Sequence, residues 1–91
     1  RRSIKKNFII GLNMRVVINV KLKGGVLDPA GKATQNALNS LGFDGVSNVR
    51  IGKQIVFELA QNDPKIAHEM AQKMCDELLA NPVIEDYEIV I

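Results

Sequence analysis

The two residues of this chain with the most reactive side chains are one histidine and one cysteine. His68 and Cys75 are the only representatives of their types in 91 residues. A general base needs a nucleophile or a substrate proton within reach, and no residue at motif spacing supplies one for His68. A reactive thiolate needs nearby positive charge, whereas Asp76 and Glu77 follow Cys75 directly. The pattern predicts a surface or core-rim histidine, a buried structural thiol and no catalytic residue in this chain.

The acidic residues near the C-terminus do not predict a metal site. Glu85, Asp86 and Glu88 fall in an expected strand, in which neighbouring side chains point to opposite faces. Glu85 and Asp86 therefore cannot chelate one ion simply, and a single His and a single Cys cannot build a zinc cluster. We expect these carboxylates to line a solvated strand edge, and we expect no metal site.

Two short motifs could contact an anion or a carboxylate. Gly31-Lys32 falls in the first turn of an expected helix, where free N–H groups and the helix dipole favour negative charge. The glycine spacing fits neither G-x-x-x-x-G-K-[ST] nor G-x-G-x-x-G, so a plain helix start with a solvated Lys32 is the alternative. Arg50 and Lys53 flank Gly52, and an arginine there suits bidentate contact with carboxylate or phosphate. Plain surface charge is the alternative for this pair.

Two Asp-Pro pairs predict the starts of the helices that position these residues. Asp28 and Asp63 are good N-caps, and proline suits the first helical position because it has no N–H to leave unpaired. We expect the first helix to end at Gly42 and the second near Ala80, just before Pro82. Each helix has an apolar stripe at helical spacing, which predicts packing against a sheet. The stripes are Ala30, Ala33, Ala37, Leu38 and Leu41, and Ile66, Ala67, Met70, Ala71, Met74, Leu78 and Leu79.

Four further segments alternate apolar and polar residues and predict strands at 15–23, 46–51, 54–60 and 83–91. A tight turn at Gly52-Lys53 is expected between the second and the third. The order strand, helix, strand, strand, helix, strand is that of the ferredoxin-like βαββαβ fold of the α+β class. The prediction is a two-layer sandwich with two helices on one face of an antiparallel sheet.

Length and charge limit the possible functions. A single domain of this size buries about 60–65% of its unfolded surface, so a homodimer or tetramer is expected to support it. Lys and Arg number 12 against 10 Asp and Glu, but four of these cations lie in residues 1–13, leaving 8 against 10 in residues 14–91. The folded part therefore has no positive excess for nucleic acid. No apolar run is long enough for a membrane span, and a lone cysteine fits the reducing cytoplasm.

Residues 1–13 are expected to form a poorly ordered N-terminal extension or a cloning remnant, and residues 14–91 a single domain. Within this fold class, an RNA-reading sheet needs exposed aromatic residues, and Phe57 is expected to face inward. An acylphosphatase-like site needs a glycine-rich loop followed by a Phe-Arg pair, and the segment 24–29 lacks it.

Three motifs make the chain resemble the PurS family, the small subunit of phosphoribosylformylglycinamidine synthase. They are Val26-Leu27-Asp28-Pro29-x-Gly31-x-Ala33, Val49-Arg50-x-Gly52-Lys53 and Leu78-Leu79-Ala80-Asn81-Pro82-Val83-Ile84-Glu85-Asp86-Tyr87. The resemblance covers Met14 to Ile91. It departs from the family at Ala30, where glutamine is frequent, and in residues 1–13.

The resemblance implies the fourth step of de novo purine synthesis, in which formylglycinamide ribonucleotide, glutamine and ATP give formylglycinamidine ribonucleotide. It implies a non-catalytic subunit that bridges a large synthetase subunit (PurL-like) and a glutaminase subunit (PurQ-like) and supports ammonia transfer. ATP and Mg would be used by the synthetase, with no cofactor bound here. The residues expected to contact partners or to shape the contacting loops are Asp28, Gly31, Lys32, Arg50, Gly52, Lys53, Asn81, Pro82 and Glu85.

Two copies are expected to pair through their sheet edges. Two alternatives remain open from the sequence. One is an ACT-like dimeric module that binds a small regulatory molecule, and the other is an adaptor for an unrelated complex.

Overall fold

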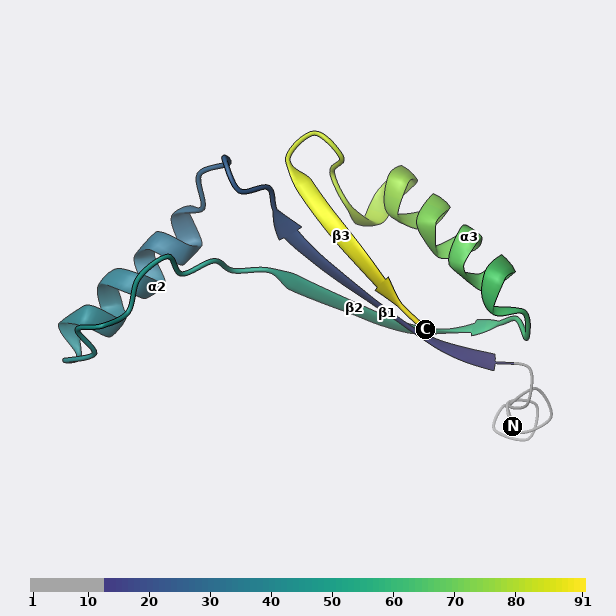
Figure 1. The fold of residues 1–91 in the computed structure, drawn as a ribbon, viewed down its shortest axis with the longest axis horizontal. Coiled ribbons are helices and arrows are strands. Elements are labelled where there is room, and N and C mark those ends of the chain that lie inside the picture. Colours follow the sequence, from purple (N-terminus) through teal and green to yellow (C-terminus); the bar gives the residue numbers. More distant parts are fainter. Residues whose placement is uncertain (1–12) are drawn as a thin grey trace, which may run out of the picture.

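The computed structural model describes residues 13–91, which form an α+β fold of three strands and two α-helices (Figure 1). Residues 1–12 lie outside this description, so the prediction of an N-terminal extension applies almost entirely to residues that the structure does not describe. Asn13 already belongs to the first strand. The elements are β1 (Asn13–Leu22), α2 (Pro29–Ser40), β2 (Lys53–Ala60), α3 (Pro64–Met74), the π-helical turn η2 (Cys75–Leu79) and β3 (Glu85–Val90).

The sheet has the strand order β2-β1-β3, and both neighbouring pairs are antiparallel. The register places Val17 opposite Val56 on one side and opposite Val90 on the other. Because successive side chains alternate between faces, Val16, Ile18 and Val20 point together to the opposite face, where all three are buried. This alternation confirms the half-buried first strand.

Helix α3 covers this face through its small residues. Ala67, Ala71 and Cys75 follow one another at four-residue spacing, and all three are buried. The predicted stripe was wider, but Ile66 and Met70 remain more than a third exposed, because the small residues beside them make the close approach. The thiol of Cys75 is buried, as expected, and burial raises its pKa, with the neighbouring Asp76 carboxylate adding to the effect.

Helix α2 does not cover the sheet, so the prediction of two helices on one face is wrong. It projects beyond the end of β1, and the chain returns along it through residues 41–52, here called the return segment (Figure 1). We call residues 23–52, comprising α2 and its flanking segments, the arm. The helix itself has its expected ends: Asp28 caps it, and Gly42 adopts a φ of +100° just after it.

The second predicted strand, at 46–51, and the tight turn at Gly52-Lys53 are also absent. The chain instead runs extended from the return segment straight into β2 (Figure 1). The physical reason is that backbone N–H groups of the return segment find partners on the arm. Val49 N–H donates to Gln35 Oε1 at 3.3 Å, and Ile51 N–H donates to an Asp28 carboxylate oxygen at 2.8 Å.

The projecting arm makes the molecule long for its size. Its radius of gyration is 17.9 Å, whereas a compact domain of this length would have about 12 Å. The apolar stripe of α2, which was predicted to pack on the sheet, does not contact it. Leu41 is 74% exposed, and Phe43, two residues later, is 57% exposed. The arm therefore carries an apolar surface that its own chain does not cover.

Candidate functional site

A single carboxylate joins the start of α2 to the end of the return segment. Asp28 is only 6% exposed. Its Oδ1 accepts the Gly31 N–H at 2.8 Å, and its Oδ2 accepts the Ile51 N–H at 2.8 Å. These bonds, the Ile51 N–H first, hold the pKa of the Asp28 carboxyl below its ordinary value of 3.8, with a smaller contribution from Arg50. The carboxylate therefore fixes two segments that are more than 20 residues apart in the chain.

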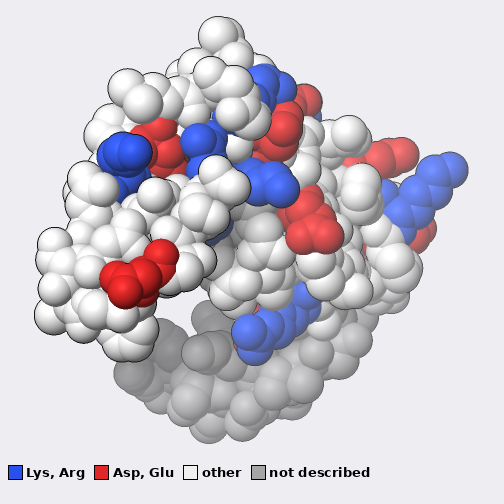
Figure 2. Space-filling model, turned by 60° about the vertical axis from the view of Figure 1, so that its left-hand side comes forward, with Lys and Arg blue, Asp and Glu red and all other residues white. Residues whose placement is uncertain are grey.

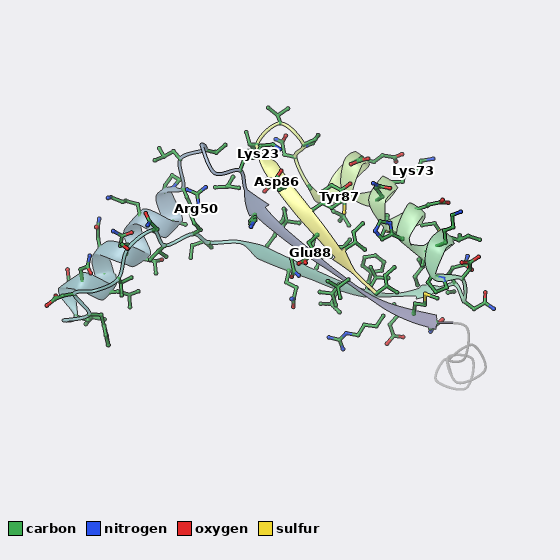
Figure 3. All side chains as sticks on the ribbon, in the orientation of Figure 1. Lys23, Arg50, Lys73, Asp86, Tyr87 and Glu88 are labelled. Carbon is green, nitrogen blue, oxygen red and sulfur yellow. The ribbon has the colours of Figure 1, made fainter. Side chains whose placement is uncertain are left out.

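Arg50 completes this connection from the other side. Its Nη2 donates to the carbonyl oxygens of Lys23 at 3.0 Å and Val26 at 2.9 Å, and its Nε lies 3.9 Å from Asp28 Oδ2. Figure 3 shows Arg50 at the junction between the arm and the sheet. The Arg50 guanidinium thus contacts two backbone carbonyls and one carboxylate of its own chain, and these contacts hold the loop that leaves β1. We call Asp28 and Arg50, with these bonds, the clasp.

Two glycines let the backbone segments approach one another at the clasp. A Cβ on Gly31 would collide with the carbonyl oxygen of Val49, and a Cβ on Gly52 would lie 2.8 Å from the carbonyl oxygen of Val20. The Gly31 N–H is already bonded to Asp28, so it is not free for the external anion considered from the sequence. Lys32 is exposed on the first turn of α2.

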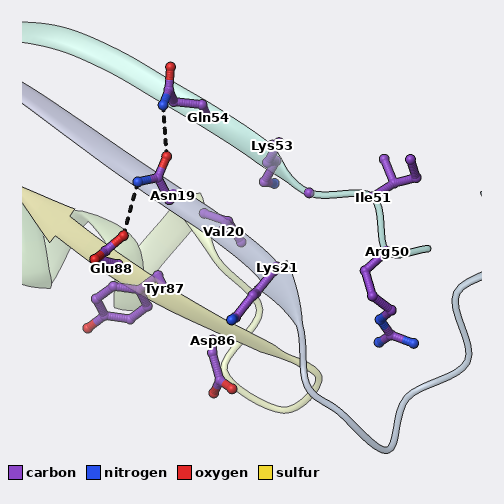
Figure 4. A pocket seen from close by; sticks show the side chains of 11 residues that line it. Asn19, Val20, Lys21, Arg50, Ile51, Lys53, Gln54, Asp86, Tyr87 and Glu88 are labelled. Atoms are coloured by element: carbon purple, nitrogen blue, oxygen red, sulfur yellow. Dashed lines mark hydrogen bonds between the residues drawn. The ribbon is translucent and has the colours of Figure 1, made fainter. Parts of the chain in front are cut away.

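An open groove of about 600 Å³ lies where the sheet meets the return segment (Figure 4). Across it, Gln54 Nε2 donates to Asn19 Oδ1 at 2.9 Å, and Asn19 Nδ2 donates to Glu88 Oε1 at 3.1 Å. Its cations and its carboxylates are mixed, and its lining contains neither a histidine nor a cysteine. Arg50, Gly52 and Lys53 all line this groove, so the structure brings these predicted residues together.

The other predicted residues shape a separate loop between η2 and β3. The Asn81 N–H donates to Glu85 Oε1 at 2.6 Å, and the Glu85 N–H returns to the Asn81 carbonyl at 2.7 Å. Asn81 Oδ1 also accepts the Val83 N–H at 3.0 Å. These reciprocal bonds, together with Pro82, hold the loop of residues 80–84 in one conformation. Asn81, Pro82 and Glu85 therefore determine the shape of this loop.

The sequence analysis missed the two side chains that this segment presents. Leu78 was predicted to belong to the apolar stripe of the second helix, and it is 82% exposed. Val83 was predicted to begin the last strand, and it is 79% exposed. For Leu78 no simple sequence signal was available, because a π-helical turn at residues 75–79 changes the angle between successive side chains. The last strand also begins at Glu85, two residues later than predicted, which leaves Val83 in a turn.

Positive and negative side chains are mixed on the displayed face of the molecule. Figure 2 shows lysine and arginine side chains interspersed with acidic ones over the face it displays. Lys23 pairs with Asp86 at 2.7 Å at one end of the sheet. Within residues 13–91, no cluster of three or more His, Cys, Asp or Glu side chains is placed to hold a metal ion. In the same part of the chain, no helix has the length and apolar composition to cross a bilayer.

The fold and these sites define a small α+β chain whose distinctive residues organise loops and uncovered apolar surface. A family model described as PurS: Phosphoribosylformylglycinamidine (FGAM) synthase matches residues 15–91. The chain belongs to the PurS family of phosphoribosylformylglycinamidine synthase, which confirms the resemblance drawn from its three motifs.

The relatives support this membership over most of their length. The PurS subunit of Synechocystis sp. is 54% identical over 70 residues, which are 77% of this chain and 70% of that protein. The PurS subunit of Methanocaldococcus jannaschii is 45% identical over 78 residues, which are 85% of this chain and 93% of that protein. The crystal structure of the M. jannaschii protein aligns with a TM-score of 0.75 at 43% identity, covering 84% of this chain and 92% of that one. A chain in the structure of PurLQS from Thermotoga maritima aligns with a TM-score of 0.79 at 33% identity, covering 86% and 95%.

The close approach at Gly31 predicts a strong effect of a single methyl group. We expect Gly31→Ala to lower the free energy of unfolding by about 1–3 kcal/mol, because the Val49 carbonyl must move away from its position beside α2. The matched control is Gly45→Ala, since a Cβ there meets nothing within 4 Å, and we expect a change within about 0.5 kcal/mol. Denaturant unfolding at one protein concentration measures both. Equal midpoints for the two variants would contradict the tight contact.

The lowered pKa of Asp28 predicts a pH-dependent contribution to stability. A carboxyl with a lowered folded-state pKa stabilises the fold fully at pH values above its unfolded pKa, and the contribution is lost as the pH falls through the folded pKa. We therefore expect Asp28→Asn to be less stable than the parent at pH 7, with a difference that narrows below about pH 3.8. Unfolding midpoints between pH 7 and pH 2.5 measure the difference, with the exposed Asp44→Asn as control. A difference that stays constant over this range would show that the charge of Asp28 is not what stabilises the clasp.

Proposed function

We propose that this chain is the non-catalytic subunit that bridges the synthetase and glutaminase subunits of phosphoribosylformylglycinamidine synthase and supports the transfer of ammonia between them. Membership of the PurS family carries the proposal. It is supported by a homologous chain in the structure of PurLQS from T. maritima, whose name combines PurL, PurQ and PurS. By extension, PurL-like and PurQ-like proteins are the partners of this chain.

The distribution of apolar surface in residues 13–91 favours a role in assembly. The fully buried core is small, and its hydrophobic members are Val16, Ile18, Val20, Ala67, Ala71, Cys75 and Ala80. Large exposed side chains occur both on the arm, at Leu41 and Phe43, and on the loop after η2, at Val83. Exposed apolar surface of this kind in a small domain is typical of chains that are stabilised by binding to other subunits.

We propose that a second copy covers the arm. The arm of a second copy could pack on the inner face of β2. Helix α3 lies over β1 and β3, whereas Ile55, Phe57 and Leu59 on β2 are only partly buried. The outer edge of β2 also has no neighbouring strand within the described chain. These two places are those that the first helix and the second strand would occupy in a closed ferredoxin-like fold.

Exchange of arms between two copies would complete that arrangement in each half. The α2 helix of one copy would lie beside α3 of the other, and the return segment would run along the free edge of β2. This is a more extensive contact than pairing through sheet edges alone, since it also covers the apolar stripe of α2. Binding to a second copy would stabilise a domain with a small core by mass action.

The chemistry of the reaction would then belong to the partner subunits. We propose that this chain binds no cofactor, that ATP and Mg are used by the synthetase subunit, and that the complex is cytoplasmic. The clasp and the 80–84 loop would act by fixing the shape of the contact surfaces. Lys53 at the groove and Lys32 on the arm are both exposed and could contact a partner subunit.

Activity in a reconstituted system tests this function. Purified synthetase and glutaminase subunits are assayed for glutamine-dependent formation of formylglycinamidine ribonucleotide, with and without this chain. We expect glutamine-dependent synthesis to require the chain, while ammonia-dependent synthesis by the synthetase subunit alone is unchanged, because only the first reaction needs the bridge. Equal glutamine-dependent rates without the chain would contradict the role. A ligand-specific rise in melting temperature without partners would then favour an ACT-like regulatory module.

Replacing the apolar side chains of the arm tests the second copy. We expect Leu41→Ser with Phe43→Ser to shift the mass measured by light scattering from dimer to monomer, because both side chains would be buried against the other copy. The control is Val83→Ser, an equally exposed residue outside the arm. Circular dichroism shows whether each variant remains folded. A folded arm variant with the parental mass would rule out arm exchange.

A further inference from the structure

Three valines lie side by side on the face of the sheet opposite α3, which we call the outer face. The register pairs Val17 on β1 with Val56 on β2 and with Val90 on β3, so the three form one row across the sheet, here called the valine row. Directly opposed side chains have Cβ atoms about 4.5–5.5 Å apart, so the row is continuous. Val56 is 46% exposed and Val90 is 47% exposed. The free face of an antiparallel sheet is ordinarily polar, so an apolar row in its middle indicates a contact surface.

The helices of the described chain leave the outer face uncovered. Val16 and Ile18 alternate with Val17 and point to the other face, where they pack with residues of α3 and η2. Helix α2 projects beyond the end of β1 (Figure 1). The proposed exchange of arms would cover the inner face and the free edge of β2, and neither of these belongs to the outer face. The outer face therefore remains accessible in a homodimer of that kind.

A ladder of hydrogen bonds crosses the outer face two residues away from the valine row. Gln54 Nε2 donates to Asn19 Oδ1, and Asn19 Nδ2 donates to Glu88 Oε1, so all three strands take part (Figure 4). The ladder holds the Glu88 carboxylate through one of its two oxygens. The other oxygen can accept a further donor. A charged group that is already ordered loses little conformational entropy when it binds a partner.

Opposite charges lie on the two sides of the valine row. Arg15 precedes Val17 by two residues on β1, and Glu88 precedes Val90 by two residues on β3, which runs in the opposite direction. Both side chains are exposed, and neither forms an ion pair with another residue of the described chain. The other charged residues of the outer face, by register, are Lys21, Glu58 and Asp86. Because both signs are present, the face does not match a partner of uniform charge.

The same face of a second copy is complementary to this arrangement. A two-fold axis that crosses the strands at Val17 places every valine against the same valine of the other copy. This axis reverses the strand direction, so Arg15 of each copy lies over Asn19 and beside Glu88 of the other. Sheets that pack face to face lie about 10 Å apart, a separation that an arginine side chain and an opposing carboxylate can span together. A contact with parallel strands would instead place Arg15 against Arg15, and like charges repel.

The size of the outer face fits a contact weaker than the exchange of arms. Three strands about 4.8 Å apart and nine residues with a rise of about 3.3 Å form a face of roughly 400 Å² on each copy. One pair of copies would bury roughly 800 Å², which is at the low end for a specific interface. Two homodimers that engage both of their outer faces would bury roughly 1,600 Å², the size of a standard interface.

From these observations we infer that the outer face is a second interface between copies of this chain. The valine rows of two copies meet in it, and Arg15 of each copy pairs with Glu88 of the other. This contact joins two homodimers into a tetramer and does not depend on the bridging function. Because it is smaller than the contact made by the arms, dilution separates the homodimers from one another before it separates the copies within a homodimer.

The mass of the full chain as a function of protein concentration tests the inference. Val56→Lys/Val90→Lys opposes like charges across the contact, and Leu78→Lys/Val83→Lys adds the same charge at exposed positions outside the sheet. We expect light scattering to show a rise from dimer to tetramer with concentration for the parent and for the second variant. The first variant should remain a dimer at every concentration, with the melting temperature that the parent has in dilute solution.

Exchange of the two charges tests the orientation of the contact. We expect Arg15→Glu and Glu88→Arg each to raise the dissociation constant of the tetramer at least about tenfold, because each substitution opposes like charges. The combined variant Arg15→Glu/Glu88→Arg should return to within about threefold of the parent, because the pair is restored with its signs reversed. Loss of a merely structural role of either side chain would not be rescued in this way.

Four outcomes decide the inference. A parent that remains a dimer at its highest soluble concentration would overturn it, and so would a tetramer that survives Val56→Lys/Val90→Lys or is not restored by the charge exchange. If that lysine variant keeps the parental mass but no longer binds a purified synthetase or glutaminase subunit, the outer face belongs to that partner, and the inference is also overturned. If Leu41→Ser/Phe43→Ser still doubles its mass with concentration, the contact is confirmed independently of arm exchange.

Discussion

The architecture depends on one buried carboxylate that serves two segments at once. As a helix cap, Asp28 uses one oxygen for the N–H of Gly31, which is the ordinary role of an aspartate before proline. Its second oxygen accepts the N–H of Ile51, which would otherwise be free to take part in a β-ladder. Because the Ile51 N–H is already hydrogen-bonded at the base of the arm, it is not available for pairing residues 46–51 with β2 in a hairpin. The projecting arm and the extended entry into β2 follow from this choice.

The clasp also explains why an arginine and two glycines accompany the aspartate. Arg50 holds the carbonyl groups of the loop that leaves β1, and a lysine could not bond two carbonyls with the same planar geometry. Gly31 and Gly52 admit backbone oxygens where a Cβ would not fit. Their role in this chain is thus first conformational, since they allow the close backbone contacts at the base of the arm.

Because the arm projects from the sheet, its apolar side chains are exposed and available to other chains. A closed two-layer domain would have covered the stripe of α2 and the inner side of β2 with one another. In the observed arrangement both are incompletely covered by their own chain, while the loop at residues 80–84 precedes β3 at the other edge of the sheet. The monomer therefore keeps apolar surface available for association with other chains.

The sequence alone determined the local elements, because their signals are local. Asp28-Pro29 and Asp63-Pro64 begin the helices, Gly42 ends the first, and the alternation around Ile18 identifies the central strand. The three motifs also determined the family, since several residues in fixed order are specific even where each one is not.

Only the tertiary structure decided how these elements are combined. Whether residues 46–51 pair with β2 or follow α2 depends on which acceptor their N–H groups reach, and Asp28 lies 23 residues away from Ile51 in sequence. The exposure of Leu78 likewise depends on a π-helical turn, which changes the angle between successive side chains and has no simple sequence pattern. Periodicity shows which residues share a face of an element, but it cannot show whether that face is covered by its own chain or by another.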